Sequence, residues 1–181
     1  MKIDKKFKSL IHEGWRYKFE GDIKTTEALE IDLDRGLFIT GSIKAGKYIK
    51  AGGYIEAGGS IEAGWYIKAG GYIEAGWSIE AGGYIKAGWY IKAGWSYGII
   101  AGLSITCKTT LSFGLRLFAG VCNWRKIEDE DKTITCGKLE NGTIEYGILR
   151  ETGLEEEKKE DDKTEEAMKL LKEQGYRIVK V

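Results

Sequence analysis

Chemistry is first suggested by the segment GSIKAGKY, residues 41–48, which differs at one position from a phosphate-binding loop. That loop has the pattern G-x-x-x-x-G-K-[ST], in which backbone N–H groups hold phosphates and the lysine reaches the terminal oxygens. The two glycines and Lys47 fit the pattern, but Tyr48 stands where a small hydroxyl would bind Mg²⁺. Taken alone, the segment indicates a nucleotide site that lacks one ligand.

A second candidate is GWSYG, residues 94–98, which matches the G-x-S-x-G pattern that presents a nucleophilic serine at a sharp turn. Ser96 would need a histidine as its base, and the only histidine, His12, lies far upstream in the sequence. The match to this catalytic pattern is therefore interpreted as coincidence.

Both segments belong to a hexapeptide array, and the array explains them better than catalysis does. A phosphate-binding loop leads into a helix, whereas here one rung follows another, so no nucleotide site is expected at 41–48. No catalytic residue, metal ligand or cofactor is predicted, and the protein is expected not to be an enzyme. The array reads GSIKAG KYIKAG GYIEAG GSIEAG WYIKAG GYIEAG WSIEAG GYIKAG WYIKAG, with isoleucine at positions 43, 49, 55, 61, 67, 73, 79, 85 and 91.

Each rung has the alternation of a short strand followed by a corner. Residues two apart share a face of a strand, so isoleucine and alanine point inward and the lysine or glutamate between them points outward. Glycine follows where a positive φ or a close backbone approach is wanted, and such corners permit either winding. The residue before isoleucine repeats about every 18 positions, which predicts an all-β, three-sided β-solenoid with about 18 residues per coil.

The solenoid is expected to extend beyond the obvious array. Aliphatic pairs in the same register predict a span of 31–120, about fifteen rungs or about five coils. A two-residue insertion at 96–98 interrupts the register once.

Caps are predicted at both ends. Residues 1–30 carry an apolar stripe with helical spacing, which predicts a short amphipathic helix as an N-terminal cap. Residues 121–150 contain two strand-like runs around Asn141 and Gly142, which predicts a C-terminal β-hairpin cap. Residues 151–181 read as a charged linker followed by a helix and a short strand. The N-terminal stripe consists of Ile3, Phe7, Leu10 and Ile11.

The composition limits the partners and the compartment. The chain has 181 residues with 28 basic and 28 acidic side chains, so no net field draws it to nucleic acid or to a membrane. It has 26 glycines and no proline, which suits strands that must donate ladder hydrogen bonds. The charged N-terminus does not resemble a signal peptide, and no apolar run is long enough to span a membrane. Three cysteines, Cys107, Cys122 and Cys136, indicate reduced thiols in a cytoplasm, with Cys107 in an inward slot.

The outward residues differ from side to side. The first side carries serine with lysine or glutamate, and the third carries tyrosine with mostly glutamate. The second side carries Tyr48, Tyr66 and Tyr84 beside Lys50, Lys68 and Lys86.

The lysine column needs an explanation, because like charges on neighbouring strands are destabilising. One interpretation is that the lysine stems splay over the tyrosine rings and keep the surface hydrated. The other is a basic, aromatic strip that meets an anionic partner, either single-stranded nucleic acid stacking on tyrosine or an acidic protein surface. Direct binding of nucleic acid is left open.

Tryptophan replaces glycine at several corners of the later coils. Because the two residues interchange within one stack, the indoles are expected to point outward, with Trp77 directly below Trp95. They predict an apolar edge that is either an interface or is covered by residues 121–181. The corner tryptophans are Trp65, Trp77, Trp89 and Trp95.

The rungs resemble those of known repeat families. The pattern resembles hexapeptide acyltransferases, but no rung holds the histidine that those enzymes use. Rungs such as GSIEA and GYIKA are similar to those of bactofilins, which polymerise end to end as scaffolds, although the caps expected here argue against open-ended stacking. The I-[KE]-A-G array at 41–95 looks like small repeat proteins of bacteria and their phages, and that resemblance implies an inhibitor of a host defence complex, such as an anti-CRISPR protein.

The sequence therefore predicts a non-catalytic β-solenoid binding protein that presents a Tyr/Lys side and a tryptophan-rich edge. The expected partner is a protein or nucleoprotein complex in the cytoplasm of a bacterial host cell, with a homo-oligomer as a further option and no membrane partner. A bactofilin-like self-assembling scaffold and a small-ligand or nucleotide binder at a subunit junction are the alternatives.

Overall fold

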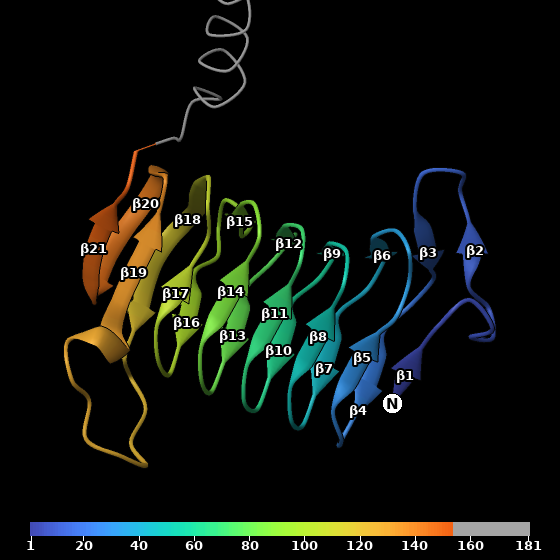
Figure 1. Ribbon diagram of the computed structural model, residues 1–181, viewed down its shortest axis with the longest axis horizontal. Coiled ribbons are helices and arrows are strands. Elements are labelled where there is room, and N and C mark those ends of the chain that lie inside the picture. Colours follow the sequence, from blue (N-terminus) through green and yellow to red (C-terminus); the bar gives the residue numbers. More distant parts are fainter. Residues whose placement is uncertain (154–181) are drawn as a thin grey trace, which may run out of the picture.

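Residues 1–153 are described in the computed structural model, and they form a continuous three-sided β-solenoid (Figure 1). The inward isoleucines are fully buried, Ile67 among them, and the inward alanines nearly so. The core is thus a column of isoleucine layers separated by alanine layers. The outward residues of each rung alternate with these buried ones, as the period of two requires.

Parallel strands stack in register along each side. The first side contains β4 (Ile23–Thr25), β7 (Ile43–Ala45), β10 (Ile61–Ala63), β13 (Ile79–Ala81) and β16 (Ile99–Ala101). The second contains β1 (Lys2–Ile3), β5 (Leu29–Ile31), β8 (Ile49–Ala51), β11 (Ile67–Ala69), β14 (Ile85–Ala87), β17 (Ile105–Thr106), β19 (Thr133–Cys136) and β21 (Ile148–Glu151). The third contains β3 (Tyr17–Phe19), β6 (Leu37–Ile39), β9 (Ile55–Ala57), β12 (Ile73–Ala75) and β15 (Ile91–Lys92).

Longer strands close the C-terminal end of the stack. The ten-residue strand β18 (Thr110–Ala119) pairs with β15 through Leu111 and with β16 through Leu117, so it turns the corner between the third and first sides. The strand β20 (Lys138–Tyr146) runs parallel to β18. Within the described part of the chain, the one short helix is a 3₁₀ turn, η1 (Glu130–Lys132).

The number of coils exceeds the prediction. The second side is an eight-stranded sheet, so the solenoid has about eight coils rather than about five. The number of coils was underestimated because the rungs at both ends keep buried residues at the inward positions but do not have the I-[KE]-A-G sequence. The prediction of about 18 residues per coil is confirmed.

The predicted N-terminal helix is wrong. Residues 1–30 contain strands β1, β3, β4 and β5, together with β2 (Ile11–His12), which pairs antiparallel with β3. Ile3 is an inward strand residue paired with Ile31, and Phe7 and Leu10 pack against the same core. These apolar residues have helical spacing, but pairing with the exposed edge of β5 favours a strand instead.

The predicted C-terminal hairpin is also wrong. Asn141 and Gly142 lie within β20, where the register against β18 shifts between Ser112 and Arg116. Gly142 has a φ of 107°, and any side chain there would collide with the ring of Phe113. The Asn-Gly pair thus lies at an irregularity in a parallel strand and does not form a turn. The predicted helix and strand of the tail lie outside the described residues.

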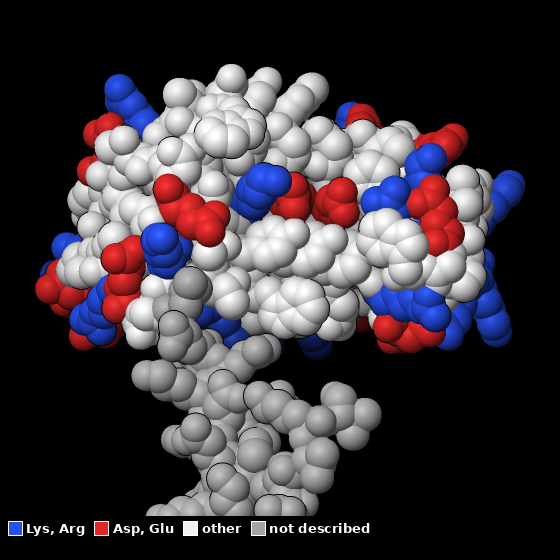
Figure 2. Space-filling model, turned by 90° about the horizontal axis from the view of Figure 1, so that it is seen from above, with Lys and Arg blue, Asp and Glu red and all other residues white. Residues whose placement is uncertain are grey.

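Outward charges are mixed over much of the surface. Seen from above, acidic and basic side chains lie next to one another in a row across the solenoid (Figure 2). In residues 1–153 no helix is long and apolar enough to cross a membrane.

Candidate functional site

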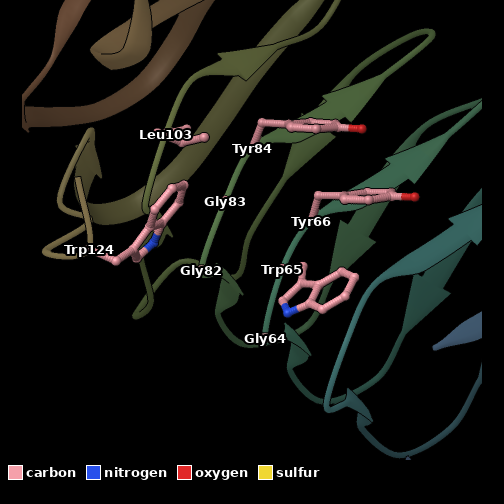
Figure 3. Close-up of a pocket in the computed structure, with 8 residues that line it drawn as sticks. All are labelled: Gly64, Trp65, Tyr66, Gly82, Gly83, Tyr84, Leu103 and Trp124. Atoms are coloured by element: carbon pink, nitrogen blue, oxygen red, sulfur yellow. The ribbon is translucent and has the colours of Figure 1, made fainter. Parts of the chain in front are cut away.

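The second side carries a column of stacked tyrosines. Tyr48, Tyr66 and Tyr84 precede β8, β11 and β14, which pair in register, so their rings lie directly above one another. The ring centroids are 4.9 and 4.8 Å apart, and the ring planes differ by 1° and 4°. Figure 3 shows Tyr66 and Tyr84 parallel, with both hydroxyls at the same edge of the column.

This stacking determines what the tyrosines can offer to a partner. Each inner ring face is already covered by a neighbouring ring, and a flat base cannot enter a gap of 4.8 Å between centroids. The column therefore presents ring edges and hydroxyl groups, and base stacking on these tyrosines is disfavoured. The hydroxyl of Tyr48 donates to Glu30 Oε1 at 2.8 Å, which together with burial raises the pKa of Tyr48.

Beside the tyrosines runs a column of lysines. Lys68 lies opposite Lys50 on one neighbouring strand and opposite Lys86 on the other, and all three are exposed. None of the three has an ion pair with any residue in 1–153. Glu30 lies opposite Lys50 in the preceding coil, but its carboxylate accepts a hydrogen bond from the Tyr48 hydroxyl instead.

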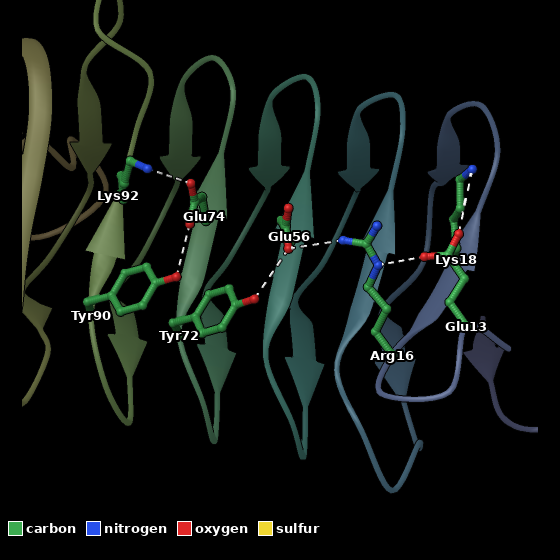
Figure 4. Close-up of polar contacts among 8 residues, drawn as sticks. All are labelled: Glu13, Arg16, Lys18, Glu56, Tyr72, Glu74, Tyr90 and Lys92. Carbon is green, nitrogen blue, oxygen red and sulfur yellow. Dashed lines mark hydrogen bonds and ion pairs between the residues drawn. The ribbon is translucent and has the colours of Figure 1, made fainter. Parts of the chain in front are cut away.

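The third side shows the opposite arrangement, in which charges are matched (Figure 4). Its tyrosines also stack, but the hydroxyl of Tyr72 donates to Glu56 at 3.2 Å and that of Tyr90 to Glu74 at 3.0 Å. Glu74 also pairs with Lys92 at 2.7 Å. Burial, with the neighbouring carboxylates, raises the pKa values of both tyrosines.

The first side is matched as well. Lys44 pairs with Glu62 on the adjacent strand at 2.6 Å, which raises the pKa of the lysine. The Ser78 hydroxyl donates to Glu80 at 3.0 Å. Of the three sides, the second alone stacks three lysines that form no ion pair with any described residue, although Glu30 lies opposite Lys50.

An apolar groove adjoins this lysine-bearing side at the corner that leads into it. Its volume is about 510 Å³. Gly83 lies between Trp65 and Leu103 in the corner stack, as the hydrogen bonds from Leu103 N to Gly83 O and from Gly83 N to Trp65 O show. Trp124 reaches over from the loop after β18 and forms the opposite wall (Figure 3). Tyr66 and Tyr84 line the groove too, so it is continuous with the tyrosine column.

The predicted tryptophan edge is divided among three corners. All four indoles are exposed, as predicted, but Trp65 lies at the corner before the second side and Trp89 at the corner before the third. Trp77 stacks on Tyr97 at 6.0 Å and not on Trp95, because the two-residue insertion pairs Ile79 with Ile99. These residues therefore do not form one continuous patch.

The structure adds Trp124 to the site, and the sequence reasoning missed it. This residue lies outside the hexapeptide pattern, so no period marked it. The one available signal was a large aromatic side chain in the mostly polar segment 121–132. It is 63% exposed and Trp65 is 54% exposed.

The two motifs that suggested catalysis belong to the solenoid. Lys47 forms an ion pair with Glu27 of the preceding coil, and strand β8 follows it where a phosphate-binding loop would need a helix. Ser96 lies in the exposed insertion. Among residues 1–153, no group of three or more histidine, cysteine or acidic side chains is placed to hold a metal ion.

The buried cysteines occupy core positions. Cys107 fills an inward slot of its rung, and burial raises its pKa to about 12. Cys136 lies in the next coil, where burial raises its pKa to about 11. Neither thiol is available as a nucleophile at neutral pH.

Comparison of this chain with protein families, with curated proteins and with solved structures finds no match.

Proposed function

We propose that this protein is a non-catalytic binding module whose second side docks onto an anionic surface of a macromolecular partner. The observation that carries the proposal is the unpaired column Lys50, Lys68 and Lys86. On the other two sides, Lys44 and Lys92 pair with Glu62 and Glu74 on adjacent strands. A column of like charges on neighbouring strands costs stability, so a partner that supplies negative charge offsets that cost.

The rigidity of the surface supports the same function. The lysines project from short strands whose backbones are held by in-register ladders on both sides. The tyrosine rings beside them are fixed by stacking. The backbone and the rings therefore lose little conformational entropy when the surface binds, which favours affinity and specificity.

The partner class follows from what the surface displays. Ammonium groups and tyrosine hydroxyls next to each other are donors suited to carboxylates, so a protein or nucleoprotein complex with an acidic face fits best. Inhibition of a bacterial defence complex, which the resemblance to small phage and bacterial repeat proteins implies, is the specific form we propose for this binding.

A scaffold that assembles end to end is the second candidate. It is favoured by the parallel strands that continue from β1 to β21 along the second side of the described chain. At the C-terminal coil, Leu149 is 37% exposed, whereas inward aliphatic residues of the central coils are fully buried. Filaments formed by the purified full-length chain would support this candidate.

Affinity capture from bacterial lysate tests the main proposal. The wild type is compared with a variant in which Lys50, Lys68 and Lys86 are changed to glutamate, and both protein and nucleic acid are identified. The three glutamates repel one another as the lysines do, and the change at position 50 adds repulsion with Glu30, so circular dichroism checks that the variant is folded. The folded variant is expected to lose the partner. A control variant makes the same change at exposed lysines outside this column that have no ion pair among the described residues: Lys8, Lys108 and Lys138. Equal capture by all three proteins would refute the proposal.

A further inference from the structure

The groove between Trp65 and Trp124 has the shape of a receptor for one large apolar side chain. Its floor is backbone, because Gly82 and Gly83 contribute no side chains. Leu103 closes one end, and Trp65 and Trp124 line the groove from different elements (Figure 3). A volume of about 510 Å³ lies within the range of protein pockets that hold ligands.

The walls of the groove are unusually apolar for exposed surface. The two tryptophan side chains are more than half exposed, and the remaining lining residues are glycine, leucine and tyrosine. Tryptophan is the residue type most enriched among those that dominate binding energy at interfaces. An exposed apolar hollow bordered by polar groups is the usual form of an interaction site.

Lysines border the groove on the edge that faces the second side. Lys68 and Lys86 extend from the strands that follow Tyr66 and Tyr84, and they have no ion-pair partner in the described chain. No carboxylate lines the groove. On the first side, beyond the glycine corner, Glu62 pairs with Lys44 and Glu80 accepts the Ser78 hydroxyl.

These features distinguish between two kinds of anionic partner. A nucleic-acid strand carries a continuous row of phosphates, which would pass close to the carboxylates on the first side. It would also gain little from the tyrosines, whose inner ring faces are occupied by neighbouring rings. A polypeptide carries separate carboxylates that can meet the lysines while an apolar residue enters the groove.

We propose that the groove and the adjoining lysines bind an acidic polypeptide segment through one large apolar anchor residue. The anchor inserts over Gly83 between Trp65 and Trp124, and acidic residues flanking it pair with Lys68 and Lys86. This inference rests on the proposed function, because it names the chemistry of the partner that the second side recognises.

Selection from a random peptide library on the immobilised full-length chain tests the inference. Selected sequences are expected to combine an aromatic or large aliphatic residue with flanking aspartate or glutamate. Binding of the consensus peptide is then measured by tryptophan fluorescence and by calorimetry, with oligothymidylate as the nucleic-acid probe. Peptide affinity is expected to fall steeply between about 0.05 and about 0.5 M salt.

Matched variants distinguish binding of the anchor residue in the groove from nonspecific binding to exposed tryptophans. Trp65→Ala and Trp124→Ala are each expected to weaken peptide binding by about tenfold or more. Trp89→Ala removes an indole of similar exposure, 60%, from another corner and is expected to leave binding within about twofold. Circular dichroism checks that every variant is folded.

Several outcomes would overturn the inference. They are selected peptides without acidic enrichment, equal losses for Trp89→Ala and Trp124→Ala, and tight binding of oligothymidylate in place of peptide. If the triple lysine variant loses its lysate partner while Trp65→Ala and Trp124→Ala retain it, the proposed function stands and the anchor groove is refuted.

Discussion

Because neighbouring coils are in close contact at the glycine corners, we predict that Gly70→Ala destabilises the solenoid. The hexapeptide glycines of the array have negative φ, so they are not needed for a left-handed backbone. A Cβ atom built at residue 70 lies far inside contact distance of the carbonyl oxygen of Gly52 in the preceding coil. The same atom built at residue 52 has nothing closer than the Leu33 carbonyl oxygen, at 4.0 Å. The two positions belong to one corner stack and differ in the space above them.

The magnitude follows from what must move. Ordinary contact requires about 3.5 Å, so an alanine at 70 forces the two coils apart by roughly 1 Å or more. Overpacking of this kind costs about 1–3 kcal/mol. It also lengthens the hydrogen bonds from Gly70 N to Ala51 O and from Gly71 N to Gly53 O, each worth about 1 kcal/mol. Alanine also makes the unfolded chain less flexible, which offsets a small part of this cost. We therefore expect the free energy of unfolding to fall by about 2–4 kcal/mol.

Urea and thermal unfolding followed by circular dichroism measure this difference. Gly70→Ala is expected to melt about 4–16 °C below the wild type, since about 1 kcal/mol corresponds to about 2–4 °C at this chain length. Gly52→Ala is expected to be neutral or more stable by about 0.4–1 kcal/mol. Equal unfolding free energies for the two variants would refute the argument that close approach, rather than helix or strand propensity, selects glycine at these corners.

Three further results are expected from the same geometry. Ile67→Asp places an unpaired charge in a fully buried layer and should unfold the array, whereas Ile67→Val should cost only about 1 kcal/mol; a cooperative, unshifted melt of the aspartate variant would contradict the inward assignment. A thiol reagent at pH 8 should modify Cys122 in the native protein and leave the two buried thiols, Cys107 among them, unmodified until urea is added, and rapid native reaction of all three would count against the core placement. Burial raises the pKa values of Tyr72 and Tyr90, so the folded state holds their protons more tightly than the unfolded state; stability should be fully present below about pH 10 and fall as the pH rises beyond it. Replacing both tyrosines with phenylalanine should flatten that alkaline decline in a pH series of melts, and an unchanged slope would disprove the assignment.

The repeat region was predictable because one physical rule governs every rung. The period of two within each strand and the period of about 18 along the chain together place each side chain inward or outward and on a given side. The ends were not predictable from the same signals. Ile3 and Phe7 have helical spacing, and only the presence of an unpaired edge on β5 shows that they belong to a strand and its corner.

The candidate site was partly predictable for a similar reason. The lysine column follows from the period, since residues 18 apart lie side by side in neighbouring coils. The groove depends on a loop that crosses a corner, and nothing periodic places Trp124 opposite Trp65. Likewise, the pairing of Trp77 with Tyr97 depends on how the chain absorbs the insertion, which spacing alone does not determine.

That insertion has a consequence for how the chain finds its alignment. Near-identical rungs can stack one whole coil out of phase while still burying isoleucine on isoleucine, so a uniform array would have slipped isomers of similar energy. The longer coil at 96–98 can be accommodated in only one phase, where Tyr97 lies over Trp77 and Ile99 over Ile79. The insertion thus fixes the register of the stack, and the regular rungs on either side can align with one another in one way only.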